Sequence, residues 1–129
     1  MTYPSEVYLD THAVIWLVNG ELQKFGQTAL NYMANCPLKI SPMVKFELQY
    51  LYEIKRLQKS PDEIIREITQ KASFEICQKS WLDIVNVALT CDFTRDAFDR
   101  LIVAHAMLDN SILISKDEKL TCHYNNCVW

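Results

Sequence analysis

Residues 7–18 pass from a strand-like run into an apolar helix with almost nothing between them. The β-prone run Val7-Tyr8-Leu9 stops at Asp10, and the apolar residues 13–18 follow closely. A strand that leads directly into a buried helix is typical of α/β proteins. Ligands of an open parallel sheet bind just outside the carboxyl ends of the strands, so we expect Asp10 and Thr11 at the functional edge. Alternatively, either residue simply caps the helix.

The same alternation of elements continues along the chain. Ser41-Pro42 supplies an N-cap and a first-turn proline, and the apolar spacing extends that helix to about Leu57. Gly20 closes the first helix. The patterns predict strands at 7–10, 39–41, 73–77 and 111–115, and helices at 12–19, 26–35, 42–57, 60–71, 81–89 and 94–108.

Length and composition predict one domain spanning residues 1–129. The chain is 50% hydrophobic, which is enough for a core, and it has no apolar run approaching the roughly 20 residues that span a bilayer. No basic segment leads into an apolar stretch at the N-terminus, so we expect a cytoplasmic protein without a membrane anchor. The five cysteines are odd in number and widely spread, which favours reduced, buried thiols.

Charge and glycine content exclude several functions. A net charge of −3 and a pI near 5.5 argue against binding nucleic acid through a large positive field. They remain compatible with a nuclease, because metal ions can supply the positive charge that faces phosphate. With only two glycines, Gly20 and Gly26, glycine-rich nucleotide-binding loops are effectively excluded.

Two further acids occupy positions like that of Asp10. Asp117 follows the strand at 111–115, and Glu47 lies near the start of the helix that begins at Pro42. Taken singly, Asp117 is a turn aspartate and Glu47 a solvated helix acid. Their recurrence at one predicted edge favours a shared site.

A helical wheel separates two aspartates of the segment 94–108. Asp96 and Arg100 share one stripe at i,i+4, which predicts an exposed ion pair. Asp99 falls in an apolar sector, where an ionised carboxylate is costly unless it is paired, hydrogen-bonded or bound to a metal. We therefore expect Asp99 to be a ligand and Asp96 to be an outer-shell residue. His105 also falls among apolar positions and is more simply a hydrogen-bonded core histidine.

The chain resembles the PIN-domain ribonucleases, and within them the VapC-type toxins of toxin–antitoxin pairs. The resemblance covers nearly the whole chain. It rests on four blocks in order, namely Tyr8-Leu9-Asp10-Thr11-His12-Ala13-Val14-Ile15-Trp16-Leu17, Ile40-Ser41-Pro42 with Phe46-Glu47-Leu48, Asp96-Ala97-Phe98-Asp99-Arg100-Leu101-Ile102-Val103-Ala104-His105-Ala106, and Ile114-Ser115-Lys116-Asp117-Glu118. Departures at Ala97, His105 and Lys116, where such toxins often have proline, glutamine and arginine, remove no acidic residue.

The resemblance implies a three-layer α/β sandwich around a central parallel sheet of about four or five strands. It assigns Asp10, Glu47, Asp99 and Asp117 to an acidic catalytic site. Thr11 and Ser115 become hydroxyl neighbours that orient these acids or a bound water. The family also implies an RNA substrate, a homodimer, and a small antitoxin that blocks the cleft, presenting arginine to the carboxylates.

Oxygen ligands of this kind suit Mg²⁺ or Mn²⁺. We expect Asp10 and Asp99 to hold the principal ion, with Glu47 and Asp117 completing the site directly or through water. One ion or two, the latter about 3.5–4 Å apart, would serve hydrolysis of an RNA phosphodiester bond. The candidate phosphate contacts are Arg100, Lys116 and Lys45, although each is an ordinary surface cation by default.

Two other classes of protein compete with this hypothesis. One is a PIN-like module that binds a partner or RNA without cutting it, which the intact acidic set disfavours. The other is a receiver-like, phosphate-handling regulator, which would carry an acid pair near the first strand where this chain has Asp10 alone. A zinc site at Cys122, His123 and Cys127 is disfavoured because no second paired motif completes the ligand set.

Overall fold

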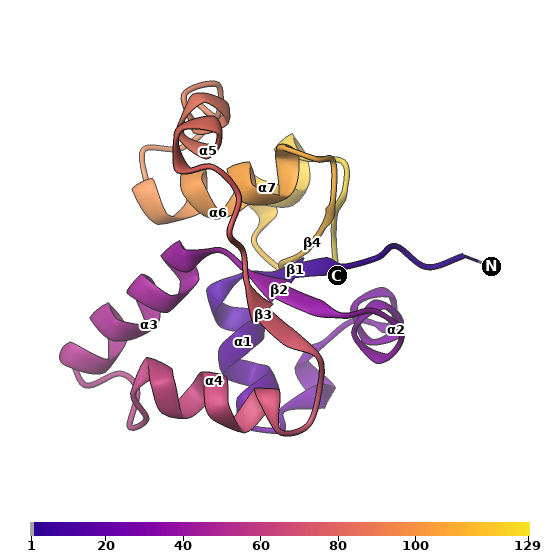
Figure 1. The fold of residues 1–129 in the computed structure, drawn as a ribbon, viewed down its shortest axis with the longest axis vertical. Helices are drawn as coiled ribbons and strands as arrows, with labels where there is room; N and C mark the ends of the chain where they lie inside the picture. Colours follow the sequence, from indigo (N-terminus) through magenta and orange to yellow (C-terminus); the bar gives the residue numbers. More distant parts are fainter. Residues whose placement is uncertain (1) are drawn as a thin grey trace.

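The computed structural model describes residues 2–129 and forms one five-stranded parallel sheet covered by helices on both faces (Figure 1). The strand order is β3-β2-β1-β4-β5. The strands are β1 (Val7–Leu9), β2 (Leu38–Ile40), β3 (Phe74–Ile76), β4 (Ile112–Ile114) and β5 (Cys127–Val128). This architecture confirms the predicted α/β sandwich and its parallel sheet.

Helices connect each strand to the next. They are α1 (Thr11–Val18), a 3₁₀ turn η1 (Leu22–Lys24), α2 (Gln27–Asn35), α3 (Pro42–Glu53), α4 (Pro61–Thr69), α5 (Trp81–Ala88), α6 (Ala97–Met107) and α7 (Glu118–His123). Figure 1 shows α1 and α4 on one side of the sheet and α5, α6 and α7 on the other. Among residues 2–129, no helix is long and apolar enough to cross a membrane.

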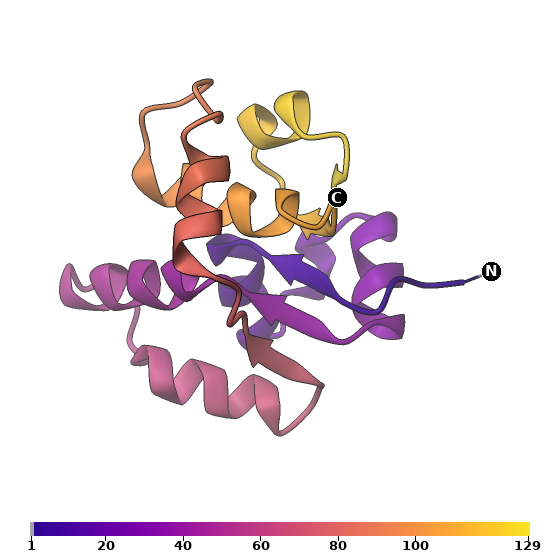
Figure 2. The same ribbon diagram turned by 45° about the horizontal axis from the view of Figure 1, so that its top comes forward.

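The strand order reverses at the centre of the sheet. The chain adds β2 and then β3 on one side of β1, and later adds β4 and β5 on the other side. In Figure 2 the arrows of β1, β2 and β3 point the same way, so their carboxyl ends lie at one edge. The gap between β1 and β4 at that edge is a topological switch point, where α/β proteins bind ligands.

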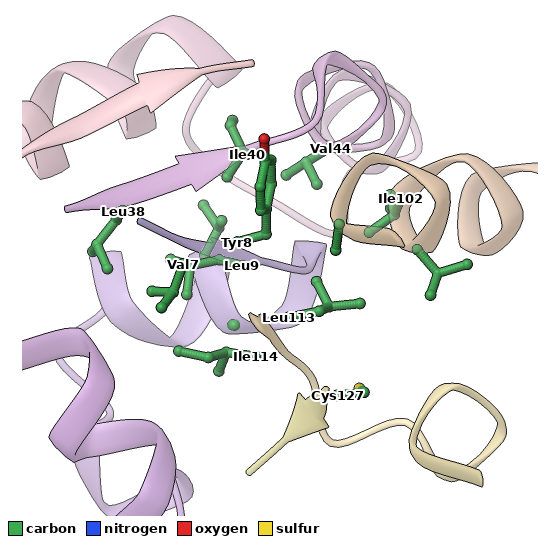
Figure 3. Packing of buried hydrophobic residues seen from close by; sticks show 14 of the residues in the cluster. Val7, Tyr8, Leu9, Leu38, Ile40, Val44, Ile102, Leu113, Ile114 and Cys127 are labelled. Atoms are coloured by element: carbon green, nitrogen blue, oxygen red, sulfur yellow. The ribbon is translucent and has the colours of Figure 1, made fainter. Parts of the chain in front are cut away.

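Burial of their side chains in the hydrophobic core stabilises these short strands. Val7, Tyr8 and Leu9 are all buried because helices cover both faces of β1 (Figure 3). In register, Val7 lies beside Leu38 on one flank and Ile112 on the other. Buried residues of β4 and α6, Leu113 and Ile102 among them, extend the same core.

Several predicted boundaries were wrong. α3 ends at Glu53 instead of continuing to Leu57, because Lys55 adopts a left-handed backbone with φ 64° and turns the chain. Ile54 is therefore 44% exposed instead of packed on the sheet. The helix at 60–71 ends at Thr69 and that at 94–108 begins only at Ala97. The chain patterns gave no sign of η1, α7 or β5.

The thiols are only partly as predicted. All five cysteines are free, and four of them are buried, but Cys122 is exposed on α7. His105 is buried and its Nδ1 lies 2.9 Å from the Leu101 carbonyl oxygen, as expected of a core histidine. Burial lowers the pKa of His105, which keeps its imidazole neutral.

Candidate active site

Asp10 lies directly beyond β1 at the switch point. It is the N-cap of α1, and its Oδ1 accepts a hydrogen bond of 2.9 Å from the Ala13 N–H. The residue is only 8% exposed, and burial raises the pKa of its carboxyl group, while the Ser115 hydroxyl and the Ala13 N–H oppose that rise. The capping role and the candidate ligand role are thus compatible, because capping uses one carboxylate oxygen.

Ser115 and Asp117 extend the site from β4. Ser115 is fully buried, its hydroxyl is close enough to the Asp10 carboxylate to lower the pKa of that group, and it accepts a bond of 3.1 Å from the Asp117 N–H. Asp117 is the N-cap of α7, and its Oδ1 accepts a hydrogen bond of 2.8 Å from the backbone N–H of Lys119. One buried hydroxyl therefore joins the ends of the two strands that flank the switch point.

Glu47 reaches the site from the second turn of α3. Its Oε1 accepts a hydrogen bond from the hydroxyl of Thr11, a buried residue at the start of α1. Ser41 caps α3 through the Met43 N–H, which fixes where that helix begins. This hydrogen bond ties the Glu47 side chain on α3 to the start of α1, next to Asp10 in the sequence.

Asp99 enters from the first turn of α6. Its carboxyl group is half-buried, and its pKa is raised to about 6 by burial first, and then by the negative charges of Asp96, Asp117 and Glu47. Lys119 opposes the rise in part. No ion pair within 4 Å to Asp99 is present among residues 2–129. Asp99 is therefore a carboxylate that lacks a neutralising partner.

The four acids meet in one cavity of about 350 Å³. Its lining residues are Asp10, Thr11, His12, Trp16, Glu47, Asp99, Ile102, Lys116, Asp117 and Leu120. The structure thus brings together side chains from near both ends of the sequence, from Asp10 to Asp117. Their mutual repulsion is the kind that a bound cation would relieve.

The donor set fits Mg²⁺ or Mn²⁺, although it does not form a closed cage. Among residues 2–129, no three acid, histidine or cysteine side chains already stand in a metal-binding arrangement. Mg²⁺ usually keeps several waters and takes only one or two protein carboxylates, so an open cavity lined by four acids suits it. The same finding gives no support to a zinc site. His123 instead stacks on Phe93 at 4.5 Å.

Asp96 acts differently from the prediction. It is the N-cap of α6, with its Oδ1 3.1 Å from the Asp99 nitrogen, and residues 2–129 contain no ion pair between it and Arg100. The Arg100 guanidinium instead donates to the carbonyl oxygens of Ala88 and Leu89 at the end of α5, at 3.1–3.4 Å. The helix begins too late for the predicted pair, and the arginine satisfies a neighbouring helix terminus instead. Asp96 still influences the site, because its charge raises the pKa of Asp99.

The three candidate phosphate contacts lie in different surroundings, and only one of them lines the acidic cavity. Lys116 lines the cavity, whereas Arg100 binds the end of α5 and lies outside the lining. Lys45 forms a 3.1 Å ion pair with Asp62 and lines a different hollow. Of the three, the structure favours Lys116 alone.

Sequence reasoning missed three residues near the cavity. His12 and Trp16 line it from α1, and Lys119 is close enough to Asp99 to lower the pKa of that carboxyl. The i,i+4 spacing of His12 and Trp16 was a usable signal, because it places both on one side of the predicted helix. The sequence did not indicate that this side faces the acids.

A family comparison decides the fold family. The model of the PIN domain matches residues 7–123, which is most of the chain. The chain belongs to the PIN domain family. This membership decides against the receiver-like alternative.

Solved structures agree on the fold. The chain is 18% identical to a chain of VapBC2 from Rickettsia felis, in a structure bound to a DNA fragment from its promoter, with a TM-score of 0.63 and coverage of 95% of this chain and 96% of that one. A toxin-antitoxin complex from Klebsiella pneumoniae gives 18% identity, a TM-score of 0.56 and the same coverages. VapBC-1 from nontypeable Haemophilus influenzae gives 17% identity and a TM-score of 0.56, with 96% of each chain covered. No curated protein sequence matches the chain.

Proposed function

We propose that this PIN domain is a Mg²⁺- or Mn²⁺-dependent endoribonuclease that acts as the toxin of a toxin–antitoxin pair. The observation that carries the proposal is the convergence of Asp10, Glu47, Asp99 and Asp117 on one cavity at the switch point of the sheet. An acidic cavity of this kind repels phosphate until a cation is bound. Membership of the PIN domain family supports a nuclease.

The residues of the chain divide the work of hydrolysis. Asp10 and Asp99 are the principal ligands in this proposal, and Glu47 and Asp117 complete the site directly or through water. When bound, the divalent ion would make a water more acidic and stabilise negative charge on the phosphate. The Thr11 hydroxyl donates to the Glu47 carboxylate, and the Ser115 hydroxyl holds the backbone N–H of Asp117 beside the Asp10 carboxylate, so both hydroxyls help to fix the acidic site. Lys116 contributes a positive charge on the same wall.

The proposed partners of this chain rest on the similar solved structures and on its exposed apolar residues. The similar solved structures include toxin–antitoxin complexes, which supports a small antitoxin as the partner of this chain. Its blocking segment would present a basic side chain to the acids. A homodimer and a cytoplasmic site of action complete the proposal. Exposed apolar residues on α3 and α5, such as Tyr50 and Leu82, are candidates for these contacts.

The test is cleavage of a single-stranded RNA by the purified chain with Mg²⁺, Mn²⁺ or EDTA. We expect cleavage with either metal and none with EDTA. Asp10→Asn and Asp99→Asn should each lower the rate by at least a hundredfold while remaining folded. Asp62→Asn is the matched control, since its carboxylate lies outside the cavity. A folded wild-type chain that binds RNA without cutting it would instead establish the PIN-like binding module.

A further inference from the structure

Two aromatic rings form part of the wall of the acidic cavity. His12 and Trp16 stand one turn apart on α1, with ring centroids 5.7 Å apart and planes inclined by 44°. Both rings line the cavity together with Asp10 and Lys116. The proposed hydrolysis assigns no role to His12 or Trp16, so their place beside the carboxylates needs another explanation.

The Trp16 ring is held firmly from behind. It makes edge-to-face contacts with Phe25, at 6.2 Å and 86°, and with Trp129, at 5.5 Å and 71°. Phe25 and Trp129 are themselves stacked at 4.9 Å. Trp16 is nevertheless only half-buried, and His12 is exposed. A fixed ring beside an exposed one offers an apolar surface whose ordering cost has already been met in folding.

Two lysines lie near this aromatic pair. The Lys24 Nζ is 5.4 Å from the centroid of the Trp16 ring, and Lys116 is in the cavity wall. Lys24 has an ion pair with Glu21 at 3.6 Å, but the two side chains are 45% and 34% exposed, so water screens that pair. Proteins commonly bind unpaired nucleic acid strands with aromatic rings that stack on the bases and nearby cations that contact the phosphates.

On the basis of the proposed function, we infer that His12 and Trp16 form a binding site for an unpaired nucleobase next to the phosphate that is hydrolysed at the acidic cavity. The base packs against this aromatic pair, and Lys24 contacts a phosphate further along the strand. Such a site selects single-stranded RNA, because a base inside a duplex is already stacked on its neighbours. It also sets the register of the strand over the acids.

A second aromatic group is the natural comparison. Phe46 and Tyr50 on α3 each pair with Phe98 on α6, at 6.0 and 6.3 Å, and Phe46 is 62% exposed. None of the three lines the acidic cavity. If the base packed on this group, it would lie outside the cavity wall, so the α1 pair is the better site.

The test combines protein variants with RNA lacking single bases. A short single-stranded RNA carries uncleavable methylenephosphonate linkages, and a series of oligonucleotides lacks the base at each position in turn. Affinity is measured by fluorescence anisotropy with Mg²⁺, for the wild type and for Trp16→Leu, Trp16→Phe and His12→Ala. Trp81→Leu and Phe46→Leu are controls, because both rings are more than half exposed and lie outside the cavity lining.

We expect one abasic position to weaken binding to the wild type about tenfold. The same abasic position should weaken binding to Trp16→Leu less than twofold, with His12→Ala between them and Trp16→Phe restoring most of the effect. Because each ratio compares two RNAs on one protein, a loss of stability in Trp16→Leu cannot produce this pattern. The controls should keep the tenfold effect.

Three results overturn the inference. They are an abasic penalty that Trp16→Leu leaves unchanged, a penalty that disappears with Phe46→Leu, and equal binding of every abasic RNA. Cleavage by the wild type together with any of these would leave the proposed nuclease standing. Base-dependent binding without cleavage of ordinary RNA would support the nucleobase site and reject the nuclease. Absence of any RNA binding would reject both.

Discussion

At the scale of single residues, Asp99 is an acid whose surroundings disfavour its negative charge. Asp96 is only three positions away, yet it serves as a helix cap, while Asp99 faces other carboxylates with no ion pair among residues 2–129. The helical wheel predicted that contrast in part. It indicated that Asp99 lies in an apolar sector, but it could not indicate that three other acids raise its pKa.

The raised pKa of Asp99 gives a prediction about stability in the absence of metal. Its pKa is about 6 in the folded protein and near 3.8 in the unfolded chain. Between these values the folded protein holds a proton that the unfolded chain has lost, so the free energy of unfolding falls as pH rises from about 4 to 6. Asp99→Asn should remove this loss and stabilise the protein at pH 7 by on the order of 1 kcal/mol, since water screens part of the charge.

Urea unfolding in EDTA between pH 4.5 and 7.5 measures this difference. Asp92→Asn serves as the control, because Asp92 is exposed and lies outside the cavity. A pH profile for Asp99→Asn that runs parallel to that of the wild type would contradict the assigned electrostatics.

At the scale of elements, α6 is fixed at its start by two independent contacts. Asp96 caps it, and Arg100 donates to the last carbonyl groups of α5. Replacing Asp96 by Ala should cost about 1 kcal/mol as a lost N-cap. Replacing Arg100 by Ala should cost roughly 1–3 kcal/mol, since it leaves helix-end carbonyl groups without a charged donor.

The Asp96 and Arg100 side chains have different partners although their backbones are bonded within one helical turn, so we expect a coupling energy below about 0.5 kcal/mol in a double-mutant cycle of the side chains. Chemical denaturation of the two single variants and the double variant provides the measurement. A coupling energy above about 0.5 kcal/mol would instead support the ion pair between Asp96 and Arg100 that the sequence pattern predicted.

The elements also show what a sequence can and cannot reveal. Long periodic segments such as those of α3 and α5, and the apolar runs of β1 and β4, were predictable because burial imposes a pattern on them. β5 is two residues long and α7 six, too short for any period to appear. The end of α3 depends on Lys55 in a left-handed conformation, which residue type does not favour. The cavity faces of His12 and Trp16 depend on how α1 packs, which is a tertiary property.

At the scale of the whole molecule, the C-terminal residue closes the fold against α2. The Trp129 carbonyl oxygen accepts from the Ala29 N–H, and its ring supports Trp16 through the aromatic cluster. A methyl group on Gly26 would come within 2.5 Å of the Trp129 oxygen. Gly26→Ala should therefore destabilise the protein by roughly 1–3 kcal/mol, because backbone atoms must move.

Thermal unfolding tests this prediction, with Gly20→Ala as the comparison. Gly20 has open space around it, so its substitution tests only the strain of a φ of 71°. A Gly26→Ala protein as stable as the wild type would show that the terminal residue does not pack as described.

We propose that the sheet and its helices bring four acids from separate elements to one cavity that holds one or two divalent cations. Binding of Mn²⁺, followed by the loss of its free electron paramagnetic resonance signal, tests this claim most directly. The wild type should take up Mn²⁺, Mg²⁺ should compete, and Asp10→Asn and Asp99→Asn should each weaken binding at least tenfold. Asp62→Asn should bind as the wild type does. Equal Mn²⁺ uptake by the wild type and Asp99→Asn, or none by the folded wild type, would contradict it.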